Sequence, residues 1–291
     1  MAKARAIVKR RRAVQNIRKI TQTMQLIATA RYQRCLQRAT AGKPYAEKIA
    51  EMIQALAGLE SVAHPLLTVN AGVPQSMLLI ITSNRGLCGA YNAALLRAAM
   101  EHRRQLAEHG ISPVLEVVGK KGVGYLRFLG LPVARSITDV EDRIALSRVA
   151  EMADRYMQAY EQRQVARVDV AYTRFHSVGV QRPQVAQLLP IEPPREDELE
   201  PRRRVRPEFE FSPPPAVLLG RLIPEAVRVR LYQYFNEAIV SEQVARMVAM
   251  KAATDAAGDM IKYLTRQYNR ARQTQITLEL ADIVGGAEAV K

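Results

Sequence analysis

The chain has 291 residues, a formal net charge of +15 and a sequence pI near 10.1, so it can bury a full core and carries a strong positive balance. That balance points to nucleic acid, an acidic lipid or a strongly acidic protein as a partner. The two cysteines, Cys35 and Cys88, lack metal-type spacing and give no sign of a disulfide scaffold. No apolar window approaches the roughly 18 residues that span a bilayer, and the start lacks the apolar core of a secretion signal. We therefore expect a soluble chain in a reducing compartment.

The first predicted element is a long basic helix over residues 1–59, whose interior has one glycine, Gly42, and one proline, Pro44. Twelve positive charges precede the first acidic residue, Glu47. An Arg-rich, acid-poor start is also typical of an organelle transit peptide, but here the helical pattern leads straight into the body of the chain. We therefore interpret the segment as part of the fold.

This helix carries two apolar stripes. Spacing of three and four residues predicts a seam for a partner helix at Ile17, Ile20, Met24 and Ile27. The same spacing then reaches arginines, so a neighbouring stripe takes over and leaves those arginines outward. Its residues are Ala28, Tyr32, Cys35 and Ala39.

The middle of the chain, residues 74–191, predicts a small Rossmann-like α/β domain. Strand-like runs at 77–82, 114–118, 165–174 and 185–191 alternate with helical stretches at 90–109, 120–129 and 144–164. Residues 192–224 follow as a proline-rich charged connector, including the charge run at 195–206.

A second long helix is predicted over residues 225–286, ended by Gly285 and Gly286. Positions 226–283 contain no proline and one glycine, Gly258. Such a helix would be about 87 Å long, whereas a compact chain of this size is roughly 50 Å across. It therefore needs a partner helix, for which a small-residue seam is available at Ala245, Ala249, Ala252 and Ala256. The fold class is thus α/β with a long antiparallel coiled coil of the N- and C-terminal helices.

Two glycine turns invite comparison with phosphate-binding loops. Gly86 and Gly89 follow a strand, and "GKKGVG" at 119–124 follows another, but neither matches a Walker loop or a dinucleotide fingerprint. We therefore interpret Gly86 and Gly89 as a packing turn. Cys88 has no nearby histidine as a base and is expected to be structural, and His102 and His109 are expected to face solvent. No catalytic, cofactor or metal site can be assembled, so we predict that the chain is not an enzyme.

The basic helix leaves three interpretations open: a solvated face, a nucleic-acid-binding arm, or a shaft inside an oppositely charged protein collar. Against the second, no groove-reading motif or aromatic stacking platform accompanies the charge. Only the shaft explains two helices too long for their globular domain.

Several segments carry a resemblance that covers nearly the whole chain. They are "NIRKITQTMQLIATARYQR", "TSNRGLCGAYN", "EFEFSPPPAVL", "SEQVARMVAMKAATDAAGDMI" and "YNRARQTQITLELADIVGGA". In this order they resemble the gamma subunits of F-type ATP synthases. The resemblance implies a non-catalytic central-stalk rotor without cofactors, whose helices turn inside a ring of alpha and beta subunits. The α/β domain would sit with the epsilon subunit on the ring of c subunits, at the cytoplasmic face of a bacterial inner membrane. The alternative from another class is a basic nucleic-acid-binding protein with a coiled-coil arm.

The resemblance also implies roles for single residues. Met24 matches the family's coupling methionine. Rotor contacts with the beta subunit and the upper collar fall at Arg272, Gln273, Thr277, Glu279 and Asp282, and the apolar tip bearing falls at Ile276, Leu280 and Ile283. The sequence departs from the family's pattern at Ile17, Asn84, Ala90 and Asp282, and the charge run at 195–206 has no strong counterpart.

Overall fold

The computed structural model describes residues 2–57, 64–191 and 214–289. The chain divides into two compact units: residues 1–29 with 246–291, which we call the helix pair, and residues 30–245, which we call the sheet unit. Each unit therefore contains a part of each of the two longest helices. The elements in chain order are α1 (Ala2–Ala41), α2 (Lys43–Ala57), a 3-10 turn (Pro65–Leu67), β1 (Gln75–Ile81), α3 (Tyr91–Glu108), β2 (Ser112–Val118), α4 (Lys120–Phe128), β3 (Arg135–Ile137), α5 (Leu146–Glu161), β4 (Val168–Ser177), β5 (Val180–Leu189) and α6 (Pro215–Ala289).

The sheet has the strand order β3-β2-β1-β4-β5, with β5 as its one antiparallel strand. Strand β1 lies at the centre and is parallel to both neighbours, which explains its unbroken apolar run "MLLII". Each of its residues from Leu78 to Ile81 is at most 3% exposed. The strand-helix alternation of the sequence therefore predicted the central sheet correctly.

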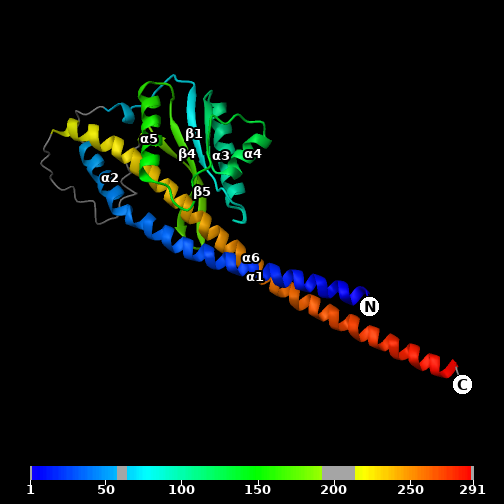
Figure 1. Ribbon diagram of the computed structural model, residues 1–291. Helices are drawn as coiled ribbons and strands as arrows, with labels where there is room; N and C mark the ends of the chain where they lie inside the picture. Colours follow the sequence, from blue (N-terminus) through cyan, green and yellow to red (C-terminus); the bar gives the residue numbers. More distant parts are fainter. Residues whose placement is uncertain (1, 58–63, 192–213, 290–291) are drawn as a thin grey trace. The chain divides into compact units, whose positions relative to one another are not determined.

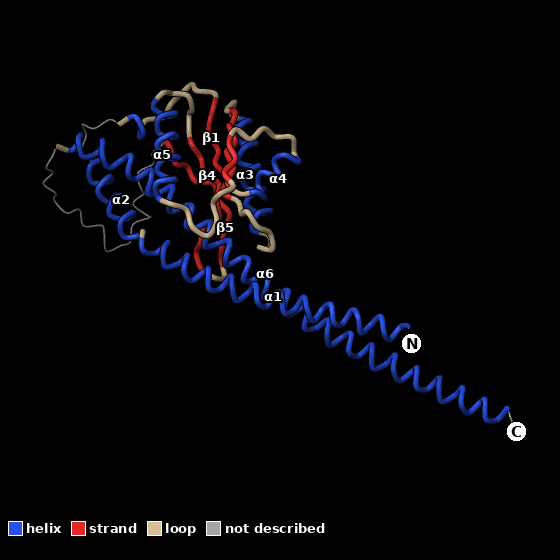
Figure 2. The backbone as a smooth tube through the Cα atoms, viewed as in Figure 1, coloured by secondary structure: helices blue, strands red, loops and turns tan. Residues whose placement is uncertain are grey.

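Helices cover both faces of this sheet (Figure 1). Alternate residues of β1 and β2 pack with α3 and α4 in one core, which includes Leu78, Ile80, Leu95 and Val117. The opposite face forms a larger core with α5 and with parts of α1, α2 and α6. Figure 2 shows the strands enclosed between these helices. The sheet unit thus has three layers.

The C-terminal half of α1 packs on the larger core. Cys35 is 4% exposed, Ala39 packs against the same core, and Tyr32 lies 6.2 Å from Phe175 between ring centroids. This confirms the second predicted stripe. Its flanking arginines are not simply outward, however, because Arg31 pairs with Asp142 at 2.7 Å.

Several boundaries differ from the sequence prediction. The N-terminal helix breaks at Gly42, so α1 and α2 are separate helices. Helix α6 begins at Pro215, about ten residues before the predicted 225, because proline is well tolerated in a first turn. It also runs through Gly285 and Gly286 instead of ending there. Strand β3 was missed, and β5 begins at Val180 instead of 185. Residues 192–213, most of the predicted connector, lie outside the described residues.

Candidate partner-binding surface of the helix pair

Within the helix pair, α1 and α6 lie side by side and antiparallel. Thr254 Oγ1 donates a hydrogen bond to Thr21 Oγ1 at 2.8 Å. Earlier in α1, the guanidinium carbon of Arg11 lies 5.4 Å from the ring centroid of Tyr268, which comes later in α6. The partner of the earlier α1 residue thus lies later in α6, so the two helices are antiparallel, as the sequence predicted.

The seam of the pair follows a regular heptad pattern on both helices. Its buried and half-buried positions recur at intervals of three, four or, where an exposed position intervenes, seven residues. The positions that keep this spacing are Ile7, Arg11, Val14, Thr21, Gln25 and Ala28 on α1, and Met250, Thr254, Ala257, Ile261, Leu264, Tyr268, Ala271 and Gln275 on α6. Half-buried positions that flank them are Val8, Met24, Thr29, Ala253, Gly258 and Thr265. This seam is rich in small and polar side chains.

The wrong stripe of α1 was assigned to the seam from the sequence. Ile17, Ile20 and Ile27 are 52%, 60% and 48% exposed, and of that stripe only Met24 is half-buried. Of the seam predicted on α6, Ala245 and Ala249 are half-buried, whereas Ala252 and Ala256 are exposed and the neighbouring Met250 and Ala257 are buried. The physical reason is that two stripes with the same spacing run along α1, and the more apolar one faces outward.

The outward faces of the pair therefore carry unusually many apolar side chains. Exposed large apolar residues are Ile17, Ile20, Leu26 and Ile27 on α1, and Val248, Met260 and Tyr263 on α6. Scattered exposed apolar side chains are ordinary, but a run of them along a helix pair marks a surface that binds another protein.

The tip of α6 is more exposed still. Every residue from 276 to 286 is exposed, and among them Ile276, Leu280 and Ile283 are 44%, 57% and 69% exposed. These three are the residues for which the resemblance implies an apolar bearing. With no burial on any side, this segment has little support of its own as a helix.

The polar residues singled out on the same segment, Arg272, Gln273, Thr277, Glu279 and Asp282, are also exposed. Their contacts are local: Thr277 Oγ1 donates to Gln273 O at 3.0 Å, and Gln275 Nε2 donates to Glu279 Oε1 at 2.9 Å. They lie along the helix instead of converging on one point, so they can meet a partner but form no catalytic centre.

Two turns were compared with phosphate-binding loops: the turn after β1, which contains Gly86 and Gly89, and the turn after β2, at the start of α4. The groups that would bind a phosphate there are hydrogen-bonded within the protein. Asn84 Nδ2 donates to Thr138 O at 2.9 Å and to Val140 O at 2.6 Å. Amide groups at the start of α4 would have to be free to hold a phosphate, but four of them are already bonded. The four bonds are Lys120 N to Asn84 Oδ1, Lys121 N to Ser83 O, Gly122 N to Thr82 Oγ1 and Val123 N to Gly119 O.

The glycines of these two turns serve packing. Gly89 has a φ of 57°, as a tight turn requires, and Gly119 has a φ of 95° with its backbone against Thr82. A Cβ on Gly119 would lie 2.4 Å from Thr82 O. The interpretation of the turn as structural therefore agrees with its geometry. Asn84 was left without a role by the sequence, and it joins the turn to α4 and to the segment after β3.

Several buried titratable side chains of the sheet unit are held in structural pairs. His102 does not face solvent as predicted: its Nε2 lies 3.0 Å from Oδ2 of Asp169, which is fully buried and also accepts from Arg167 Nη2 at 2.7 Å. His109 is exposed, as predicted. Cys88 is 2% exposed and lies 3.2 Å from Asn92 Nδ2, so it is a structural cysteine.

A second buried carboxylate, Glu116, accepts hydrogen bonds at 2.7 Å from Arg155 Nη2 and from the hydroxyl of Tyr156. Burial and the charge of Glu116 raise the pKa of Tyr156 well above its usual value. In the part of the chain that the structure describes, no group of three or more His, Cys, Asp and Glu residues could hold a metal ion. None of the described helices is long and apolar enough to cross a membrane.

Comparisons with known proteins agree with this architecture. The ATP synthase family model matches residues 3–290. The ATP synthase gamma chain of Rhodopirellula baltica is 42% identical over the full length of both chains, and that of Leptospira biflexa is 36% identical over the full length of both. The gamma chain of Saccharopolyspora erythraea is 38% identical, covering all of this chain and 98% of the relative.

Among solved structures, a chain of the Euglena gracilis mitochondrial ATP synthase (OSCP/F1/c-ring) aligns with a TM-score of 0.70 over 99% of this chain and 95% of that one, at 19% identity. A chain of the rotor of the same enzyme aligns with a TM-score of 0.66 over 94% and 99%, at 18% identity. These likenesses support the fold. All five of these proteins are ATP synthase components, so they give no support to the nucleic-acid alternative. The chain belongs to the ATP synthase gamma-chain family, the non-catalytic rotor subunits of the central stalk.

Proposed function

We propose that the helix pair of this chain turns inside a collar of alternating alpha and beta subunits, and that its rotation couples ion flow through a c ring to ATP synthesis or hydrolysis on the beta subunits. The observation that carries this proposal is the inverted side-chain distribution of the pair. Small and polar side chains make up most of the seam positions named above, while Ile17, Ile20 and Ile27 face outward. An apolar exterior needs a surrounding partner.

The charge of the pair fits such a collar if the collar is acidic. Between positions 1 and 29 there are eight basic residues and no acidic one. Exposed ion pairs are individually weak, typically below about 1 kcal/mol, so a set of them can guide a rotating surface without locking it. The charge thus supplies direction-dependent contacts beside the apolar ones.

Single residues take the following roles in this proposal. Met24 meets an acidic loop of a beta subunit, and its half-buried position leaves one side of the thioether available. The polar contacts with the beta subunit and the upper collar are made by Arg272, Gln273, Thr277, Glu279 and Asp282. Ile276, Leu280 and Ile283 form the apolar bearing at the tip. Their side chains are exposed and so can contact the surrounding subunits.

The sheet unit is proposed to form the foot of the rotor, in contact with the epsilon subunit and the c ring. This location puts the chain at the cytoplasmic face of a bacterial inner membrane, as a peripheral subunit held through the complex. In this proposal the nucleotides are bound by the neighbouring subunits and not by this chain.

Purification of a tagged chain from its native membranes under mild conditions tests the assembly. We expect alpha and beta subunits to co-purify together with ATPase activity, and we expect isolated chain to show no binding of ATP or duplex DNA. Recovery of the chain as a stable monomer without those subunits would contradict the proposal. Salt-sensitive binding to duplex DNA would favour the nucleic-acid alternative.

Replacement of Met24 by Lys tests the collar contact. The added ammonium group would alter the contact with an acidic loop, so we expect ion-driven ATP synthesis to fall more than assembly or ATP hydrolysis. Gln22→Lys is the matched control, because Gln22 is an exposed neighbour on the same helix. Equal ATP synthesis in Met24→Lys and the unmodified enzyme would refute this placement of Met24.

A further inference from the structure

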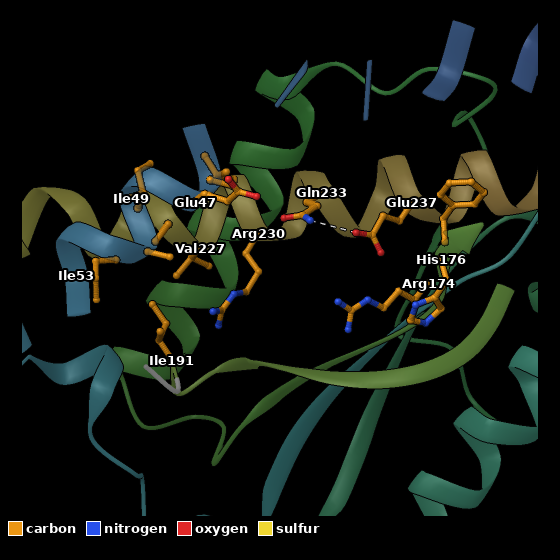
Figure 3. Close-up of a pocket in the computed structure, with 15 residues that line it drawn as sticks. Glu47, Ile49, Ile53, Arg174, His176, Ile191, Val227, Arg230, Gln233 and Glu237 are labelled. Carbon is orange, nitrogen blue, oxygen red and sulfur yellow. Dashed lines mark hydrogen bonds between the residues drawn. The ribbon is translucent and has the colours of Figure 1, made fainter. Parts of the chain in front are cut away.

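The sheet unit contains a cavity of about 450 Å³ that has no part in the proposed rotor contacts. It lies between α2, α6, the C-terminal part of β4 and Ile191, which follows β5 (Figure 3). Its volume falls within the roughly 300 to 1,000 Å³ of pockets that enclose small molecules. All of its walls belong to one compact unit.

One wall of the cavity is apolar. Ile49 and Ile53 reach it from α2, Val227 from α6, and Ile191 from the residues that follow β5. These four side chains are between 0% and 5% exposed, so they are held in place by the core behind them. The wall therefore offers a fixed surface for a hydrocarbon group.

Cationic side chains line the cavity beside this apolar wall. Figure 3 shows the guanidinium groups of Arg230, from α6, and Arg174, from β4, pointing into the same space, with His176 beside Arg174. No hydrogen bond or ion pair of 4.0 Å or less joins either guanidinium to another described residue. The two acidic residues of the lining, Glu47 and Glu237, have interactions of their own; for Glu237, Gln233 Nε2 donates to Oε1 at 3.1 Å.

Two guanidinium groups in one partly enclosed space repel each other and gain from an anion placed between them. Arginine is also well shaped for bidentate hydrogen bonds to carboxylate and phosphate. We propose that this cavity binds a small anionic amphiphile, with its carboxylate or phosphate head between Arg174 and Arg230 and its apolar chain against Ile49, Ile53 and Val227. Free acyl acids and phosphate-headed lipids share this chemistry. The site does not depend on the rotor function.

Calorimetric titration of the full-length chain tests the site with four probes: decanoate, decyl phosphate, decanol and inorganic phosphate. We expect both anionic amphiphiles to bind below their micellar concentrations, and decanol and inorganic phosphate to bind at least tenfold more weakly. The tighter of the two amphiphiles identifies a carboxylate-headed or a phosphate-headed natural ligand. Equal binding of decanol would remove the role of the arginines, and equal binding of inorganic phosphate would remove that of the apolar wall.

Three variants locate the binding. Arg174→Met and Arg230→Met each remove a charged hydrogen-bond donor and should weaken binding by roughly ten- to hundredfold. Ala50→Phe should abolish binding by filling the cavity, because Ala50 lines it and is half-buried. Arg221→Met is the matched control: Arg221 is exposed on the same helix as Arg230 and does not line the cavity. Absence of amphiphile binding, or unchanged binding in both arginine variants, would overturn the proposal.

Discussion

A disulfide across the helix pair tests which stripe of α1 forms the seam. Thr21 Oγ1 and Thr254 Oγ1 lie 2.8 Å apart, so sulfur atoms in their places are within reach of a bond of about 2.0 Å. We therefore expect Thr21→Cys/Thr254→Cys to oxidise readily in the full-length chain. The two positions are 233 residues apart in sequence. In the chain-entropy treatment a loop of that length stabilises the folded state by about 5 kcal/mol, which is an upper value if the bridge is strained.

The assay is the shift between reduced and oxidised chains on a denaturing gel, followed by the midpoint of urea unfolding with and without reductant. Ile20→Cys/Ala256→Cys is the control, because both positions are exposed and would face each other only if the predicted apolar stripe were the seam. Cys35 and Cys88 are buried and are not joined in a disulfide, and their burial limits side reactions. Efficient oxidation of the control pair, with none for Thr21→Cys/Thr254→Cys, would refute the seam that contains Thr21 and Thr254.

Three further changes test the sheet unit. Asn84→Asp should destabilise the chain by about 1 to 3 kcal/mol in urea unfolding, because a carboxylate cannot donate to Thr138 O and Val140 O; unchanged stability would show that these bonds contribute little. Gly119→Ala should cost about 1 to 3 kcal/mol or more in the same assay, since it strains a φ of 95° and brings Cβ to 2.4 Å from Thr82 O, and a neutral effect would contradict that backbone conformation. His64 Nδ1 accepts a hydrogen bond from Leu66 N at 3.2 Å, and burial lowers the pKa of His64 below 6.5. The contribution of neutral His64 to stability should therefore be present above pH 6.5 and be lost as the pH falls through the lowered pKa. His64→Asn should flatten this part of the stability profile, and an unaltered profile would assign the pH dependence to another group.

The two long helices were predictable because both are long runs of strong helix formers, which fixes helix type without tertiary information. The start of α6 at Pro215 was missed because Pro213 to Pro215 also suit an extended connector. Strand β3 has three residues, Arg135–Ile137, and too short a pattern to stand out. Its pairing with β2 depends on the neighbouring strand, which no local signal encodes.

The candidate surface was predictable in its residues but not in its orientation. Ile17, Ile20 and Ile27 were recognised as a contact stripe, but they were assigned to the wrong partner. Periodicity reports that a stripe is apolar and does not report which molecule covers it. The buried pair of His102 with Asp169 was missed for a similar reason, since the two residues meet only in the folded sheet unit.

The composition of the seam explains why an outward apolar stripe is tolerable. Arg11, Thr21 and Gln25 bury far less apolar surface than isoleucine would, so the pair alone is weakly stabilised. The contact between Arg11 and Tyr268 adds only about 0.5 to 2 kcal/mol. A partner that binds the folded pair adds stability in proportion to the logarithm of its concentration over its dissociation constant. A pair with its most apolar stripe outward therefore gains stability from being surrounded, and the cost of that arrangement is a weaker seam when the pair is alone.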